Sequence, residues 1–90
     1  MAYGALVSGV PAVVTSSGAV KATAGTLIGY LVCSTSSGTI IAYDGASASG
    51  TMMHNTLTPA AGTFIPCNMA FATGLYLTIG GTISVSVVYA

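Results

Sequence analysis

Small residues interrupt this sequence at short intervals, and their spacing limits the kind of fold that the chain can adopt. Gly, Ser and Thr recur about every eight to ten residues, and the segments between them are rich in Val, Ile, Leu, Tyr and Thr. Short apolar segments between regular turn residues are typical of antiparallel sandwiches and barrels. No apolar stripe with helical spacing continues for two turns, and Glu and Gln do not occur. We therefore predict an all-β fold, a small jelly-roll-like antiparallel β-sandwich or barrel of about eight short strands.

The expected strands follow one another without a helix. They cover residues 13–15, 20–23, 26–34, 38–44, 51–57 and 63–65, with 68–72 as either a strand or a connection. The segment 38–44 is expected to be the hairpin partner of 26–34 across a Ser-Thr-Ser-Ser-Gly turn. Together the strands predict one β-sandwich domain over residues 13–90. Residues 1–12 have no strong pattern and are a candidate N-terminal arm.

The C-terminal segment shows the clearest alternation of side chains. Leu75, Leu77 and Ile79 alternate with Tyr and Thr, and residues 83–89 alternate in the same way after two glycines. If the two runs pair directly, a two-residue Gly-Gly turn would put their apolar rows on opposite faces. A three-residue turn over residues 80–82 would join the rows, so a direct hairpin predicts a bulged turn of that length.

The expected strand 26–34 is apolar on both sides, which is typical of a strand buried on both faces. Leu27, Leu31 and Cys33 share one side, and Ile28, Tyr30 and Val32 share the other. Since only one side of a sandwich strand faces the core, we predict that the other side, centred on Tyr30, meets another subunit or another segment. Tyrosine is frequent at interfaces, so the candidate interface residues are Ile28, Tyr30, Val32, Tyr43 and Tyr76.

Charge is almost missing from the chain. Lys21 is the only strong base and Asp44 the only acidic side chain, so charged residues make up 2% of the sequence against roughly 25% in an average domain. Such a surface associates readily, and we expect partners to cover it. One lysine cannot neutralise the phosphates of a nucleic acid, so no nucleic-acid partner is expected. No apolar run reaches the roughly 18–20 residues of a membrane helix, and no secretory signal is recognised, so we expect no membrane partner and synthesis in a cytoplasm.

The few titratable groups leave little room for catalysis. His54 is the only candidate base for a serine or cysteine nucleophile, and no G-x-S-x-G elbow is present. One carboxylate cannot form the acid/base pair of a glycosidase, and Cys33, His54 and Cys67 lack the close spacing of zinc ligands. We therefore expect no enzyme, no metal and no cofactor. Asp44 is expected to cap the turn that begins at Gly45.

The sequence allows two interpretations of its two cysteines, Cys33 and Cys67. They are either buried free thiols that pack as small hydrophobic groups or a disulfide between two strands. A reducing cytoplasm favours the free thiols.

Several segments resemble the small β-sandwich structural proteins of tailed bacteriophages, which include head decoration (cement) proteins. The resemblance lies in the loop Y-D-G-A-S-A-S-G-T at residues 43–51, the G-L-Y segment at 74–76 and the terminal I-S-V-S-V-V-Y strand at 83–89. It extends over about residues 18–89. The resemblance implies no catalytic residues.

What the resemblance implies is a virion protein on the capsid surface, synthesised in the host cytoplasm. The chain would be a homo-oligomer, most simply a trimer, and would bind the major capsid protein. The main alternative is a β-domain of a phage tail or fibre that binds a host surface glycan, which would show an exposed pocket lined by tyrosines. A self-assembling coat protein of a cell or spore and a small hydrolase are further alternatives.

Overall fold

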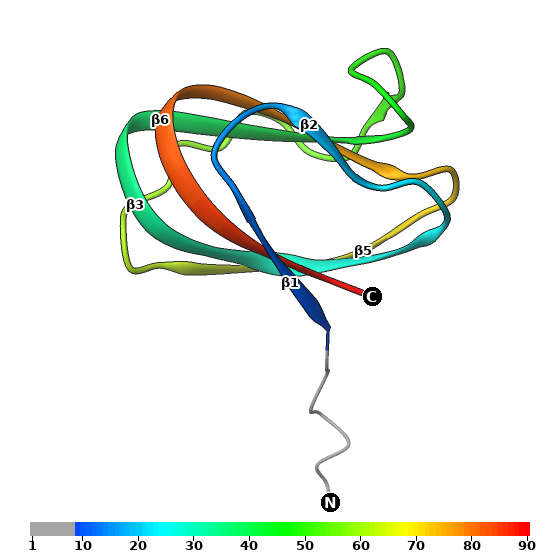
Figure 1. Ribbon diagram of the computed structural model, residues 1–90, viewed down its shortest axis with the longest axis horizontal. Coiled ribbons are helices and arrows are strands. Elements are labelled where there is room, and N and C mark those ends of the chain that lie inside the picture. The colour runs from blue at the N-terminus through cyan, green and yellow to red at the C-terminus, as the bar shows by residue number, and fades with distance from the viewer. Residues whose placement is uncertain (1–8) are drawn as a thin grey trace, which may run out of the picture.

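The computed structural model describes residues 9–90, and this part of the chain is all β (Figure 1). Six strands follow one another: β1 (Val10–Val14), β2 (Gly18–Lys21), β3 (Gly25–Asp44), β4 (Thr51–Met52), β5 (Phe64–Phe71) and β6 (Leu75–Tyr89). They form one antiparallel sheet, and no helix lies in the described range. The predicted fold class is therefore confirmed as all-β, with six strands in place of about eight.

Two long strands, β3 and β6, form the centre of the sheet. They are paired from Leu27 opposite Tyr89 to Asp44 opposite Leu75. Both strands bend at the middle of this pairing, where Ser36 and Ser37 together lie opposite Thr82. This β-bulge lets the long pair curve strongly, as Figure 1 shows for the ribbons of β3 and β6.

The shorter strands extend each half of the bent pair. β1 and β2 pair with the two halves of β6, while β5 and β4 pair with the two halves of β3. The first half of the sheet therefore runs β1-β6-β3-β5, and the second half runs β2-β6-β3-β4. Residues 53–63 follow the edge of β3 between β4 and β5, where Leu57 exchanges two backbone hydrogen bonds with Ile40.

The core lies on the concave side of the sheet, between its two halves. It contains buried apolar side chains from β3, β5 and β6: Leu27, Tyr30, Val32, Ile40, Ala42, Phe71, Leu75, Leu77, Ile83, Val85 and Val87. Because both halves contribute, bending the sheet is what removes these side chains from water.

The structure corrects both predicted hairpins. Residues 34–38 do not turn the chain back, because β3 continues through them from Gly25 to Asp44. Gly80 and Gly81 likewise lie inside β6, so the runs 75–79 and 83–89 pair with β3 and not with each other. Gly81 has φ +66° and Ser37 has φ +56°, which shows that these small residues make the bend and bulge of two long strands.

The predicted boundary between the N-terminal arm and the domain lies within β1. Val10, Pro11 and Ala12 pair with Tyr89, Val88 and Val87 of β6, so the sheet begins three residues before the predicted domain start at Val13. Residues 1–8 of the candidate arm lie outside the described residues.

Candidate functional site

The only acidic side chain, Asp44, is fixed at the end of β3. Its carboxylate accepts backbone hydrogen bonds from Ala72 N–H at 2.9 Å, Thr73 N–H at 2.8 Å and Gly74 N–H at 3.3 Å. These donors hold the pKa of the Asp44 carboxyl below its ordinary value, and Ala72 has the largest effect, followed by Thr73. Desolvation of the carboxylate opposes this lowering only in part. Asp44 thus caps the turn between β5 and β6. The prediction that it caps its own turn at Gly45 is wrong, because the partner amides lie 28 to 30 residues away in sequence.

The only histidine, His54, is bonded on both ring nitrogens. Nδ1 lies 2.7 Å from the carbonyl oxygen of Asn55, and Nε2 lies 2.7 Å from the hydroxyl of Tyr30. A carbonyl only accepts, so Nδ1 donates to Asn55, while Nε2 shares the second hydrogen bond with the Tyr30 hydroxyl. His54 therefore satisfies a buried hydroxyl, and its two ring nitrogens lie against a tyrosine hydroxyl and a backbone carbonyl, neither of which is a serine or cysteine nucleophile.

Burial controls the other titratable groups near His54. It raises the pKa of the Tyr30 hydroxyl well above its ordinary value, and the neighbouring Cys67 thiol adds to the shift. Burial also raises the pKa of the Cys67 thiol, which lowers its thiolate fraction and its reactivity. Tyr30 and Cys67 are thus held in their neutral forms.

Both cysteines are free thiols, so the disulfide alternative does not hold in this structure. Cys67 is half-buried, as the packing alternative expects in part, but Cys33 is exposed on the outer side of β3. No three or more His, Cys, Asp and Glu side chains come together as metal ligands within residues 9–90. The same range contains no helix long and apolar enough to cross a membrane.

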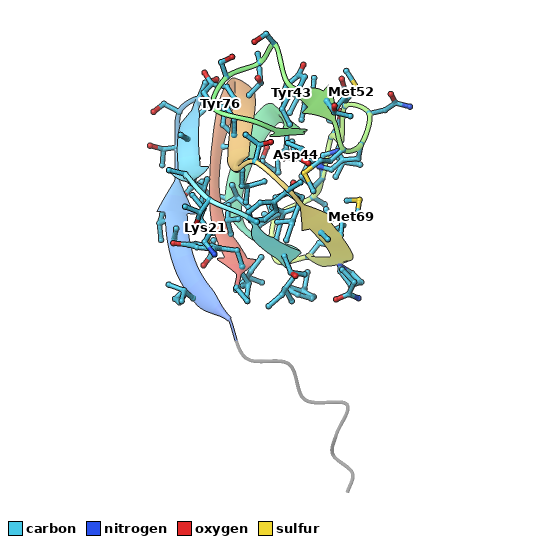
Figure 2. All side chains as sticks on the ribbon, turned by 90° about the vertical axis from the view of Figure 1, so that its right-hand side faces the viewer. Lys21, Tyr43, Asp44, Met52, Met69 and Tyr76 are labelled. Atoms are coloured by element: carbon cyan, nitrogen blue, oxygen red, sulfur yellow. The ribbon has the colours of Figure 1, made fainter. Side chains whose placement is uncertain are left out.

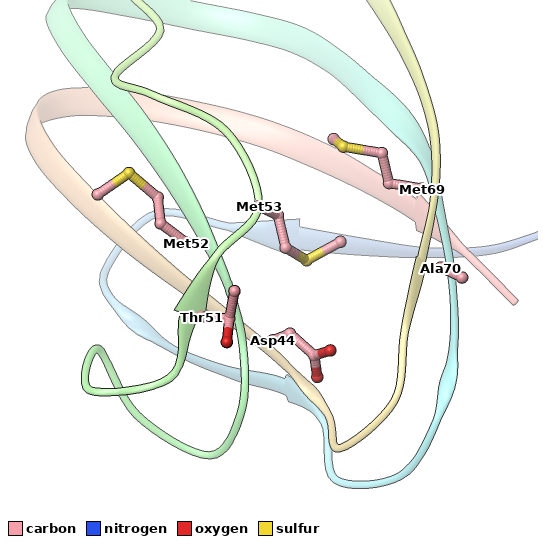
Figure 3. Close-up of a pocket in the computed structure, with 6 residues that line it drawn as sticks. All are labelled: Asp44, Thr51, Met52, Met53, Met69 and Ala70. Atoms are coloured by element: carbon pink, nitrogen blue, oxygen red, sulfur yellow. The ribbon is translucent and has the colours of Figure 1, made fainter.

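A pocket of about 360 Å³ lies between the edges of β4 and β5 (Figure 3). Its walls come from Asp44, Thr51, Met52, Met53, Met69 and Ala70. Methionine side chains adapt easily to apolar groups, but the Asp44 carboxylate is already occupied by backbone amides. No tyrosine lines this pocket, so it is not the tyrosine-lined site that a glycan-binding domain would show.

Three of the predicted interface residues are buried within the chain itself. Tyr30 and Val32 have 0% exposure and belong to the core, because their partners Val87 and Val85 face inward. Ile28 is 7% exposed and lies outside the core cluster, with its Cδ1 close to Gly9. The expectation that the Tyr30 side meets another subunit is therefore wrong.

The opposite side of this strand is the one that reaches the surface. Val13, Ser86, Leu31 and Phe64 are register partners on β1, β6, β3 and β5, so they form one row across the sheet. Val13 is 70% exposed, Leu31 44% and Phe64 47%. We call the outer side of this half, marked by this row, the first outer face. This face could not be predicted from the sequence, because both sides of strand 26–34 are apolar and the pattern does not show which side is exposed.

The second half of the sheet carries a similar row on its own outer side. Ala19, Tyr76, Tyr43 and Met52 are register partners on β2, β6, β3 and β4. Both tyrosines are half-buried, and Met52 is 49% exposed. Tyr76, Tyr43 and Met52 lie across the upper part of the molecule in Figure 2. We call this side the second outer face, and it contains the two predicted interface residues that reach the surface.

Neither row contains a charged group. Lys21 Nζ donates to the backbone carbonyls of Ala24 at 3.0 Å and Ala90 at 3.3 Å, and Asp44 is held by the β5–β6 turn. Figure 2 shows Lys21 well below Tyr76 and Tyr43. The side chains of the two rows can thus be covered without burying a charge that belongs to the rows themselves.

No family model matches the sequence, and neither a curated protein nor a solved structure is significantly similar to the chain.

Proposed function

We propose that this chain is a structural virion protein of a tailed bacteriophage, a capsid decoration (cement) protein. It binds the outer surface of the head as a homo-oligomer and stabilises the shell. The observation that carries the proposal is the pair of uncharged outer faces, on which Val13, Leu31, Phe64 and Met52 are each more than 40% exposed. Exposed apolar side chains on uncharged faces of a small domain support an interaction surface.

The proposed architecture is that of a jelly-roll-like β-sandwich. The two halves of the bent sheet would be its two layers, with the core of Tyr30, Leu77 and Val85 between them. Sandwiches of this type present flat outer faces to their surroundings. The proposal is supported by the concave core to which both halves contribute.

The proposed mechanism is mechanical. The second outer face, with Tyr43 and Tyr76 at its centre, contacts the major capsid protein. Each Å² of apolar surface that this contact removes from water contributes about 25 cal/mol. Repeated over a shell, contacts across the junctions of capsid subunits oppose the outward pressure of packaged DNA. His54, Asp44 and Lys21 serve the fold of the chain, and the mechanism uses no chemical step.

The experiment adds the purified chain to phage shells from which it has been removed. Bound copies are counted by quantitative mass spectrometry, and the temperature of shell rupture is measured. We expect saturable binding that raises the rupture temperature. Ala19→Lys, which puts a charge beside Tyr76 on the second outer face, weakens binding, whereas Ala48→Lys in the exposed 45–50 loop does not. No binding, or equal binding of both variants, would contradict the proposal.

A further inference from the structure

The first half of the sheet has two long edges, β1 on one side and β5 on the other. Within residues 9–90 each of these strands pairs on one side only. An edge with unpaired backbone N–H and C=O groups can add a strand of another chain, and charged side chains commonly prevent this. The one lysine and the one acidic side chain of the sequence lie on β2 and β3. The edges β1 and β5 therefore have no charge to protect them.

β5 carries a proline whose backbone nitrogen points to the free edge. Val32 N–H of β3 donates to the carbonyl of Thr63 at 2.9 Å, and hydrogen-bonded pairs alternate along an antiparallel ladder. Ile65 is therefore bonded to β3, whereas the backbone of the next residue, Pro66, faces outward. Because proline has no N–H, this edge lacks a donor that an added strand would need.

A β-bulge interrupts the same edge. Asn68 has φ +54°, in the left-handed region, and the register of β5 with β3 shifts between Pro66 and Met69. A bulge twists an edge strand away from the geometry that strand addition requires. The proline and the bulge thus lie next to each other on one edge.

β1 carries a proline in an equivalent position. Ala90 and Thr26 exchange two backbone hydrogen bonds of 2.9 Å, so Ala90 faces β3, and so does Val88 two residues before it. Pro11 lies opposite Val88, so this pair is not hydrogen-bonded and the nitrogen of Pro11 also points outward. Both prolines that lie in strands thus remove a donor from a free edge.

The second half of the sheet has only short edges. β2 has four residues and a register shift between Ala19 and Lys21, and β4 has two residues. Between β1 and β2 the backbone of β6 is bonded by a side chain, because Ser17 Oγ accepts from Ile79 N–H at 2.8 Å. These edges give an added strand few consecutive backbone partners.

We propose that Pro11 and Pro66 block the two long edges of this sheet against strand addition and so confine the contacts of the folded chain to its outer faces. In a chain that is 53% hydrophobic and almost uncharged, this block prevents growth into fibres. The inference goes beyond the proposed function and does not depend on it, because the edges are blocked whichever partner covers a face.

The test is fibre formation in native buffer, followed by thioflavin T fluorescence. Pro66→Val restores the missing N–H, and we expect it to form fibres roughly tenfold faster or more than the wild-type chain. Pro59→Val is the matched control, since it removes a proline that lies outside the strands, and it should leave the rate unchanged. Equal rates for Pro66→Val and the wild-type chain, or equal acceleration by Pro59→Val, would overturn the proposal.

A second measurement separates strand addition from unfolding. Phe64 has its backbone on the same free edge as Pro66, so we expect its N–H to exchange fast in the monomer and to become protected in the fibre. If Pro66→Val does not fold, the comparison is made with Pro11→Val, where the N–H of Val13 on the β1 edge is the reporter. A reporter N–H that stays unprotected, or fibres that form only where urea denaturation shows the variant to be unfolded, would overturn the proposal.

Discussion

The hydroxyl of Tyr30 and Nε2 of His54 lie 2.7 Å apart, and this hydrogen bond joins the core to the segment that follows β4. The two rings meet edge to face, with centroids 5.7 Å apart. Tyr30 is fully buried, so its hydroxyl depends on the histidine for a partner. The single histidine of the chain is thus accounted for by packing.

This pair makes an asymmetric prediction for stability. Tyr30→Phe removes the buried hydroxyl and lowers the free energy of unfolding by about 1 kcal/mol. His54→Leu leaves that hydroxyl buried without a partner and lowers it by roughly 1–3 kcal/mol. Urea denaturation of both variants and of the double variant measures the difference. A smaller loss in His54→Leu than in Tyr30→Phe would contradict the assigned role.

The lowered pKa of Asp44 predicts how the stability of the chain depends on pH. Its folded-state pKa is lowered, so its stabilisation is present above the ordinary carboxyl pKa of about 3.9 and is lost as the pH falls through the lowered value. No other side chain of the sequence is a carboxylic acid, and a comparison with Asp44→Asn isolates the share of the loss that belongs to this residue. Melting temperatures of the wild-type chain and of Asp44→Asn are compared at neutral and acidic pH. We expect the variant to melt lower at neutral pH and the two curves to converge in acid. Parallel curves would show that the cap contributes nothing.

The backbone conformation of Gly81 predicts that the bend in β6 contributes to the stability of the chain. Its φ is +66°, and a Cβ atom there would lie 2.6 Å from the carbonyl oxygen of Ser37. Gly81→Ala should therefore lower the free energy of unfolding by about 2 kcal/mol or more, through backbone strain and this clash. Gly18→Ala is the matched control, because a Cβ at Gly18 would meet no atom within 4 Å, and its effect should stay within about 0.5 kcal/mol. Equal denaturation midpoints for the two variants would argue against the bend.

The two thiols predict two rates of modification. Cys33 is exposed, whereas Cys67 is half-buried and its pKa is raised by burial. With a thiol-specific reagent in native buffer we expect one fast group and one slow group, and Cys33→Ser removes the fast one. In denaturant both should react at once. Fast reaction of Cys67 in the native chain would contradict its placement on the inner side of β5.

The sequence correctly predicts that the chain is all β because its alternation is strong, but it does not predict the pairing of the strands. Leu75, Leu77, Ile79, Ile83 and Val85 all occupy odd positions, and Gly81 fills the gap in the same series. This unbroken parity is the signal of one continuous strand. Two adjacent glycines are also the usual sign of a hairpin turn, so local turn chemistry favours the wrong pairing. Only the pairing of this segment with β3, which is distant in sequence, decides between one continuous strand and a hairpin.

The side of strand 26–34 that faces solvent could not be predicted, for a similar reason. The strand is apolar on both sides, so periodicity does not show which side belongs to the core. Val85 and Val87 of β6 decide this, since they pair with Val32 and Tyr30 and bring them inside. Leu31 is thereby left on the surface. The backbone amides that Asp44 caps could not be predicted from the sequence, because they belong to a turn that is distant from Asp44 in the chain.

The most direct test of the structural role is the copy number of this chain in purified virions, measured by quantitative mass spectrometry against the major capsid protein. The proposed cement role predicts hundreds of copies per particle, whose removal lowers the resistance of the shell to heat. A dozen copies or fewer, or a shell that is equally stable without them, would contradict it and favour a tail or fibre component.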